Sequence, residues 1–163
     1  MPVTIPGTIP GTTTGTISVD FLRNHRDCLE ICADWEYVTW GKSYGWTREN
    51  VLKSYHDMTE DDNVEQAFIA LSEGKPVGTA LLIENDHKDY KHFRPWLAAL
   101  YVDAPHRRKG VARKLVKLVE KTAHERGEKQ LFLYTLTPEI YRAMGWKIVE
   151  QFGDNKFLMK IIF

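Results

Sequence analysis

One stretch near the middle of the chain constrains the fold more than any other. PWLAALYVD, residues 95–103, is nearly continuous in apolar side chains, which is typical of a strand buried on both faces. Between residues 111 and 126 apolar side chains recur every three or four positions and predict a helix that Gly127 ends. LFLYT, residues 131–135, predicts a further strand. This stretch therefore predicts a strand-loop-helix-strand crossover at the centre of an α/β (α+β) domain.

The segments on either side of the crossover predict further strands and helices. Residues 17–22 alternate as a short strand does, and helices are expected at about 24–40 and 48–58, the first capped by Asn24 or Asp27. Strand pairs joined by turn-forming residues predict hairpins at about 66–84 and 146–162. PEIYRAM predicts a short helix that Gly145 ends. The expected order is strand, two helices, three strands, helix, strand, short helix and two strands.

The first residues differ in composition from the rest of the chain. Residues 1–16 repeat Ile-Pro-Gly-Thr and carry no charged side chain, so they predict a low-complexity arm in which Pro and Gly oppose regular structure. The 163-residue length is typical of one domain, and 43% hydrophobic residues suffice for its core. We therefore expect a single domain at residues 17–163.

Charge and cysteine content narrow the classes of function. Lys and Arg number 22, as do Asp and Glu, so there is no global field to attract nucleic acid or a membrane surface, and the one short basic cluster lacks an extended footprint. No apolar run reaches the roughly 20 residues of a membrane span, and residues 1–12 lack a signal-peptide core, so a cytoplasmic location is expected. Neither the histidines nor Cys28 and Cys32 have a usual metal-ligand spacing, and no metal is expected.

The loop before the central helix has the properties of a phosphate site. A helix entrance offers four backbone N–H groups without intrahelical partners and a partial positive charge. Gly110 and Ala112 leave that backbone accessible. Four basic side chains add charge-assisted donors: Arg107, Arg108, Lys109 and Arg113. The spacing is neither that of a Walker loop nor that of a dinucleotide fingerprint, so the loop predicts binding of a pyrophosphate or of several phosphates.

Two motifs in this chain resemble those of one enzyme superfamily. The segment 107–112, RRKGVA, follows a strand and is similar to motif A, Gln/Arg-x-x-Gly-x-Gly/Ala, of the GCN5-related N-acetyltransferase (GNAT) superfamily. Downstream, EIYRAMGW resembles the superfamily's FYxxxGF element, with Ile140 and Trp146 as departures. The resemblance extends over about residues 64–163, and over 20–60 in layout only. It implies the acyl-CoA N-acyltransferase fold, a mixed and mostly antiparallel sheet flanked by helices, with splayed central strands.

The resemblance also implies a co-substrate and the residues that bind it. Acetyl-CoA would place its pantetheine arm between the splayed strands, hydrogen-bonded by the backbone of Leu100, Tyr101 and Val102. Its pyrophosphate would lie on the basic loop, against Arg107, Arg108, Lys109, Gly110, Val111, Ala112 and Arg113. Thr135 and Tyr141 would lie near its thiol end.

The implied reaction is direct transfer of the acetyl group to a primary amine of a small molecule or peptide, in a ternary complex. Such a reaction needs a neutral amine, a donor to the developing oxyanion and a proton for the thiolate. A backbone N–H near residues 100–102 would serve the oxyanion, and Tyr141 the sulfur. Glu84, at the end of the strand beside the central one, is the expected general base and acceptor contact, with Asp86 as the alternative.

The sequence gives fewer indications of which residues bind the amine acceptor. Five aromatic residues cluster at 35–46, where the superfamily builds much of its acceptor pocket, and Tyr44 and Trp46 are the expected pocket residues. Acidic residues between 57 and 65 are a second candidate for attracting a cationic amine. Three alternatives remain open: another acyl-CoA, a hydroxyl acceptor, and a sensor that binds acyl-CoA without turnover. A homodimer is also left open.

Overall fold

The computed structural model describes residues 15–163, so the arm expected at residues 1–16 lies outside the described residues except for Gly15 and Thr16. Within this part of the chain, seven strands form one sheet in the order β1-β2-β3-β4-β5-β7-β6. Neighbouring strands are antiparallel except β4 and β5, which are parallel. The strands are β1 (Ile17–Phe21), β2 (Gln66–Ser72), β3 (Lys75–Ile83), β4 (Trp96–Val102), β5 (Gln130–Thr135), β6 (Lys147–Phe152) and β7 (Lys156–Ile162). The mixed, mostly antiparallel sheet and both predicted hairpins are confirmed.

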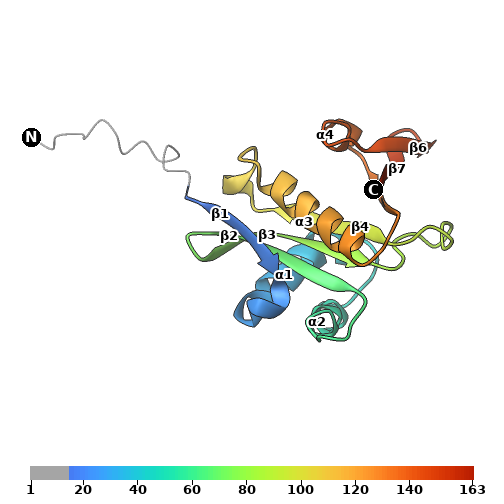
Figure 1. The fold of residues 1–163 in the computed structure, drawn as a ribbon. Helices are drawn as coiled ribbons and strands as arrows, with labels where there is room; N and C mark the ends of the chain where they lie inside the picture. Colours follow the sequence, from blue (N-terminus) through green and yellow to red (C-terminus); the bar gives the residue numbers. More distant parts are fainter. Residues whose placement is uncertain (1–14) are drawn as a thin grey trace, which may run out of the picture.

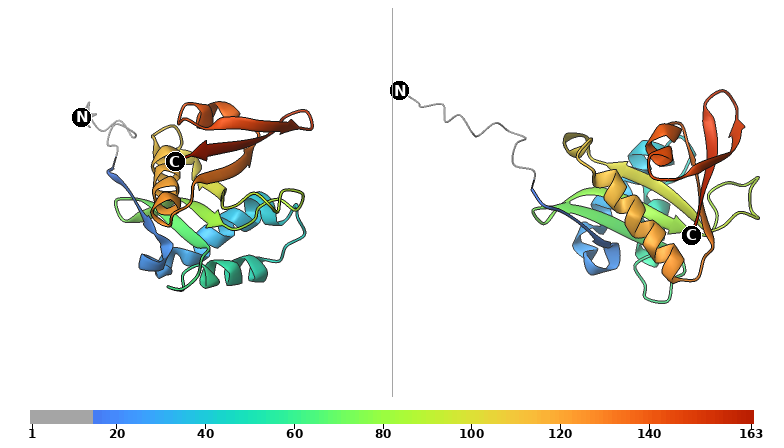
Figure 2. Two further views of the ribbon diagram at one scale, coloured as in Figure 1. Left: turned by 45° about the vertical axis from the view of Figure 1, so that its right-hand side comes forward. Right: turned by 45° about the horizontal axis from the view of Figure 1, so that its top comes forward.

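The helices cover both faces of the sheet. Helix α3 (Val111–Glu125) lies on one face of β1 to β4, and α1 (Leu29–Glu36) and α2 (Arg48–Asp57) lie on the other (Figure 1). The short helix α4 (Pro138–Arg142) lies with β6 and β7 at the side of the sheet formed by the C-terminal strands (Figure 2). Among the helices of residues 15–163, none combines the length and the apolar character needed to span a bilayer.

The first predicted helix is the one that differs most from expectation. Two 3-10 turns, at Leu22–Asn24 and Arg26–Cys28, precede α1, and a π-helical turn at Tyr37–Gly41 follows it. Neither Asn24 nor Asp27 caps α1, whose N-cap is Cys28 without a side-chain hydrogen bond. Helix α2 follows expectation, because the Thr47 side chain accepts a hydrogen bond from the Asn50 N–H at 3.1 Å and caps its N-terminus.

The core follows from the alternation of side chains along the strands. In β2, Phe68 and Ala70 pack beneath α3, whereas Ala67 and Ile69 pack on the α1 side. In β3, Leu82 faces α3. Burial of both faces explains why the central strands read as continuous apolar runs.

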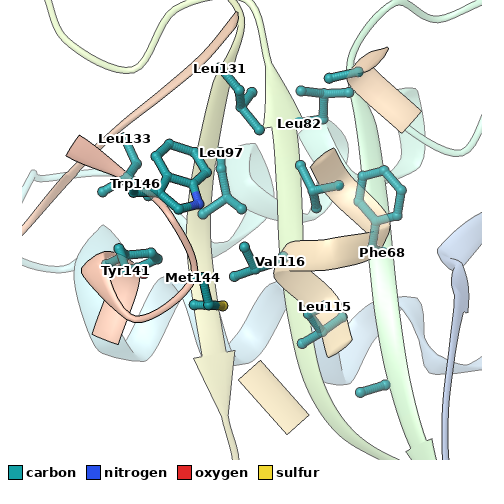
Figure 3. Packing of buried hydrophobic residues seen from close by; sticks show 14 of the residues in the cluster. Phe68, Leu82, Leu97, Leu115, Val116, Leu131, Leu133, Tyr141, Met144 and Trp146 are labelled. Carbon is teal, nitrogen blue, oxygen red and sulfur yellow. The ribbon is translucent and has the colours of Figure 1, made fainter. Parts of the chain in front are cut away.

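Helix α3 lies very close to the sheet at Gly78 of β3. A Cβ atom at this position would lie 2.8 Å from the Tyr101 carbonyl oxygen and 3.3 Å from Cδ1 of Leu115. One face of α3 packs on the sheet and carries fully buried side chains, among them Leu115 and Val116 (Figure 3). Glycine at position 78 therefore lets the helix and the central strands pack closely, with the helix entrance at the carboxyl end of β4.

Candidate active site

The two central strands separate soon after they meet. Strand β4 pairs with β3 from Trp96 to Val102, but it pairs with β5 at one position alone, where Trp96 lies opposite Phe132. Beyond that pair the two parallel strands diverge. The splay implied by the sequence resemblance is confirmed, and it leaves one side of β4 without a neighbouring strand.

A bulge lies in β4 at the point of divergence. Tyr101 pairs with Thr79 and Ala98 pairs with Leu81, so Ala99 and Leu100 together stand opposite the single residue between those partners. Ala99 has φ of 49°, a conformation that is uncommon for a residue with a side chain. As a result Ala98 and Ala99 both pack on the α1 side. The bulge thus turns the backbone of β4 at the gap, where polar groups are available to a ligand.

A cavity of about 540 Å³ occupies the region between the diverging strands. Its walls come from β4, from Tyr134 and Thr135 of β5 and from Tyr141 of α4. On the opposite side they come from the end of β3 and from the segment between α1 and α2. Six site residues predicted from the sequence line this cavity: Tyr44, Trp46, Asp86, Leu100, Thr135 and Tyr141. The structure therefore brings together the residues expected at the acceptor pocket and those expected near the thiol end of the co-substrate.

Tyr141 lies almost fully inside the protein at the edge of this cavity. Its side chain is 8% exposed, and its ring meets the Trp146 ring edge-on with centroids 6.0 Å apart. Figure 3 shows Tyr141, Met144 and Trp146 beside Leu133 and Leu97 of the core. Burial raises the pKa of Tyr141 to about 12. The hydroxyl therefore keeps its proton at neutral pH and can donate a hydrogen bond into the cavity.

Glu84, the expected general base, is not among the residues that line the cavity. Side chains alternate along the end of β3, so Leu81, Ile83 and Asn85 line the cavity while Glu84 faces the other way. An oxygen of Glu84 lies 3.6 Å from an Arg126 guanidinium nitrogen, and its backbone N–H donates to Glu65 Oε1 at 3.0 Å. The structure thus places Glu84 in an ion pair near the C-terminal end of α3.

Asp86, the alternative base, lines the cavity together with Glu36 of α1. Burial raises the pKa of Asp86 to about 7, and the negative charge of Glu36 adds to the shift. Burial also raises the pKa of Glu36, and the neighbouring Tyr55 hydroxyl opposes this shift. Within residues 15–163, no cationic side chain contributes to either shift. The cavity therefore holds two carboxylates that share one sign of charge, and one of them titrates near neutrality.

The segment between α1 and α2 closes one side of the cavity. The rings of Tyr44 and Trp46 stack with centroids 5.1 Å apart, and the hydroxyl groups of Tyr44 and Tyr134 are 3.3 Å apart, within hydrogen-bonding distance. This contact joins the segment to β5. Tyr44 and Trp46 remain half-exposed, so they form the rim of the cavity.

The basic loop leads from the end of β4 to the entrance of α3. Gly110, the N-cap residue, has φ of 81°, and no side chain of the described residues caps the first turn of the helix. The first turn also contains no acidic residue. A Cβ atom at Gly110 would meet nothing within 4 Å, so backbone conformation explains this glycine better than lack of space does. Arg108 has φ of 61°, a second positive value in the same loop.

Arg107 differs from the other basic residues of the loop. Its Nε donates to the Val102 carbonyl oxygen at 2.8 Å, and its guanidinium lies 5.7 Å from the centre of the Tyr101 ring. Arg107 is exposed, as are Arg108, Lys109 and Arg113 beside the helix entrance, but its hydrogen bond holds it against the end of β4. Tyr101 itself stacks on Trp35 and lies outside the cavity lining, as does Val102.

Several cavity residues were not expected from the sequence. Glu36, Asn85 and Tyr134 line the cavity, although no sequence pattern assigns them to a site. Trp40, one of the five clustered aromatic residues, also lines it. A signal for Glu36 exists, since it lies four residues after Cys32 and so shares the buried face of α1. A carboxylate on an apolar helix face is a candidate for a binding site.

Comparison with known proteins agrees with this geometry. Residues 25–146 match the sequence model of the Acetyltransferase (GNAT) family. N-acetyltransferase 8 of Homo sapiens is 34% identical over 85 residues, which cover 49% of this chain and 37% of that protein. The match thus spans well under half of that relative's length.

Solved structures share the fold at low sequence identity. An aminoglycoside 6'-acetyltransferase type Ii has a TM-score of 0.67 and 23% identity, over 90% of this chain and 96% of that chain. An aminoglycoside 6'-N-acetyltransferase complexed with coenzyme A has a TM-score of 0.68 and 20% identity, with the same two coverages. The match of residues 25–146, together with the splayed strands and the glycine-containing helix entrance, shows that this chain belongs to the GNAT family of acetyltransferases.

Proposed function

We propose that the protein transfers an acetyl group from acetyl-CoA directly to a primary amine that binds between Asp86 and the aromatic rim of Tyr44 and Trp46. The observation that carries this proposal is the cavity at the divergence of β4 and β5, which Tyr141 and Asp86 both line. The pantetheine arm would lie along the free side of β4, and the pyrophosphate at the N-terminus of α3.

Asp86 is the proposed general base. A primary alkylamine has a pKa near 10.4 and is protonated at neutral pH, so it must lose a proton before it attacks. A base is most effective when its pKa lies near the working pH, and the pKa of Asp86 is raised to about 7. Asp86 would take the proton directly or through one water molecule. Its negative charge and that of Glu36 would also favour the cationic form of the amine as it enters the cavity.

Tyr141 is the proposed hydrogen-bond donor to the departing sulfur. A thiol has a pKa of about 8.5, whereas the pKa of Tyr141 is raised to about 12, so complete transfer of the tyrosine proton to the thiolate would be unfavourable. A strong hydrogen bond to the developing negative charge does not require that transfer. Backbone N–H groups at the β4 bulge, near Ala99 and Leu100, are the proposed donors to the developing oxyanion.

An amine-library screen tests this proposal. Purified protein is mixed with acetyl-CoA and one amine at a time. The coenzyme A thiol that is released is measured with a colorimetric thiol reagent, and the products are identified by mass spectrometry. We expect thiol release that depends on the amine and a product heavier by one acetyl group. Parallel assays with longer acyl-CoAs and with alcohols separate the acyltransferase alternatives. Tight acetyl-CoA binding without any product over a broad library would favour a sensor instead.

A further inference from the structure

A second cavity adjoins the first beneath helix α2. Its volume is about 350 Å³, and Asn50, Val51 and Ser54 of α2 form one wall. Five residues line both cavities: Glu36, Trp46, Leu81, Ile83 and Asn85. Because they share these walls, the two cavities lie side by side, and together they are called the groove. It runs from the diverging strands past Glu36 to α2.

The composition of the second cavity changes along its length. Val51, Met58 and Ile83 supply apolar walls, and Asn50, Ser54 and Glu65 supply polar groups. An apolar wall with few polar groups suits a short alkyl chain that ends in a polar group. The indole of Trp46, shared by both cavities, offers a π face that attracts a cation.

Glu36 stands at the junction of the two cavities without a cationic partner among the described residues. Burial raises its pKa, and no positively charged side chain contributes to the shift. The neighbouring Tyr55 side chain is fully buried; burial raises its pKa, and the charge of Glu36 adds to this shift. Glu36 is partly buried, and a carboxylate that is partly withdrawn from water without a counter-ion is unfavourable, so a bound cation would offset that cost.

We infer that the acceptor is a linear diamine, which reacts at one amino group beside Asp86 while its second, cationic amino group is bound near Glu36 and extends toward the second cavity. This inference rests on the proposed acetyl transfer to a primary amine. Asp86 and Glu36 then each have one positive partner in the ternary complex. A monoamine of the same length would leave Glu36 without one.

A comparison of cadaverine with n-pentylamine tests the inference, because the two share one carbon chain and differ in the second amino group. With saturating acetyl-CoA, we expect kcat/KM of the wild-type protein to be about tenfold or more higher for cadaverine, the size expected for one partly buried charge contact. Putrescine and hexamethylenediamine, each against its monoamine, define the preferred spacing. Equal kcat/KM for diamines and monoamines at every length would overturn the inference and leave the proposed acetyl transfer standing.

Variants assign the effect to the groove. Glu36→Gln keeps the size of the side chain and removes its charge, so the ratio of cadaverine to pentylamine should fall about tenfold. Ser54→Phe, at an exposed position of α2, fills the second cavity and should raise KM for the longer diamines. Glu49→Gln removes an exposed charge of the same helix that lines neither cavity, and should keep the wild-type ratio.

Two further outcomes would also contradict the inference. If Glu36→Gln lowers kcat/KM equally for diamine and monoamine, Glu36 acts on a step common to both and does not bind a second ammonium group. If no amine is acetylated although acetyl-CoA binds, the proposed function fails and the diamine inference fails with it. A cadaverine preference that Glu36→Gln abolishes and Glu49→Gln retains would support it.

Discussion

The indole Nε1–H of Trp146 donates a hydrogen bond to Oε1 of Glu120 at 2.9 Å, and both side chains are buried. The other carboxylate oxygen of Glu120 accepts from Lys117 Nζ at 2.7 Å. The Trp146 backbone N–H donates to the Tyr141 carbonyl oxygen at 3.1 Å, and its ring packs on the Tyr141 ring. These hydrogen bonds join α3 to the C-terminal end of α4, so they hold Tyr141, the proposed hydrogen-bond donor to the sulfur, in position.

Replacement of Glu120 tests the importance of these hydrogen bonds. Glu120→Leu should leave the buried Trp146 N–H without an acceptor and lower the free energy of unfolding by about 1–3 kcal/mol, whereas Glu120→Gln keeps an acceptor oxygen and should lose less. Urea denaturation measures both values. If the leucine variant were as stable as the wild type, the hydrogen bond would have no structural importance, and another contact would have to position Tyr141.

Tyr141→Phe removes the proposed hydrogen bond to the leaving sulfur. We expect kcat to fall about a hundredfold while the Kd of acetyl-CoA changes little, because the interaction forms mainly in the transition state. Since the pKa of Tyr141 is raised to about 12, the wild-type pH profile should show no loss of activity from this residue below about pH 10. If wild-type activity fell above about pH 8, and Tyr141→Phe did not show this fall, the assignment would be contradicted.

Asp86→Asn tests the general base. A base acts in its deprotonated form, so wild-type kcat/KM should rise with pH through about 7 and then level off. The asparagine variant should lose this limb and about a hundredfold in kcat/KM. Glu84→Gln is the matched control, because Glu84 pairs with Arg126 outside the cavity lining and its replacement should preserve the profile. The assignment would be reversed if Glu84→Gln lost the limb and Asp86→Asn kept it.

The same carboxylate makes stability depend on pH. The pKa of Asp86 is about 7 in the folded protein, well above that of an unfolded chain, so the folded state binds the proton more tightly. This contribution to stability is present below about pH 4 and is lost as pH rises through 7. The Tm of Asp86→Asn minus the Tm of the wild type measures this effect. This difference should be larger at pH 8 than at pH 4 by about 3 °C or more. A Tm difference that does not change with pH would indicate that Asp86 titrates as it would in water.

The sheet and the glycine-containing entrance of α3 could be predicted because local rules determine them. Alternation in β2 and β3, the apolar stripe of α3 and the glycine at its entrance each appear within a few neighbouring residues. The bulge at Ala99 and the π-helical turn at Tyr37–Gly41 leave no comparable local pattern, because tertiary packing imposes them. Trp40 of the π-helical turn and Ala99 of the bulge both line the cavity, so part of its wall could not be predicted from local sequence.

The choice between Glu84 and Asp86 illustrates the same limit. Both follow one strand, and strand alternation alone places Glu84 and Asp86 on the same face. The strand ends at Ile83, and the loop that follows turns Asp86 back to the cavity with Asn85. The conformation of this loop, in which Tyr90 and Phe93 stack, therefore decides which carboxylate lines the cavity.

Helix α3 has a matched pair of glycines, one at each end. Gly110 at its start has φ of 81° and Gly127 just beyond its end has φ of 88°, and a Cβ atom added at either position would meet no atom within 4 Å. Alanine at either site should cost about 1 kcal/mol of backbone strain. Only at Gly110 would the strain also disturb amides proposed to hold a pyrophosphate.

Calorimetric titration of acetyl-CoA into the wild-type, Gly110→Ala and Gly127→Ala proteins is the most direct test of the proposed co-substrate site. We predict saturable binding of acetyl-CoA by the wild type with a Kd in the micromolar range. Gly110→Ala should weaken binding about fivefold, and Gly127→Ala should leave it unchanged. Absence of saturable binding of acetyl-CoA or any other acyl-CoA to the folded wild-type protein would contradict the proposed function.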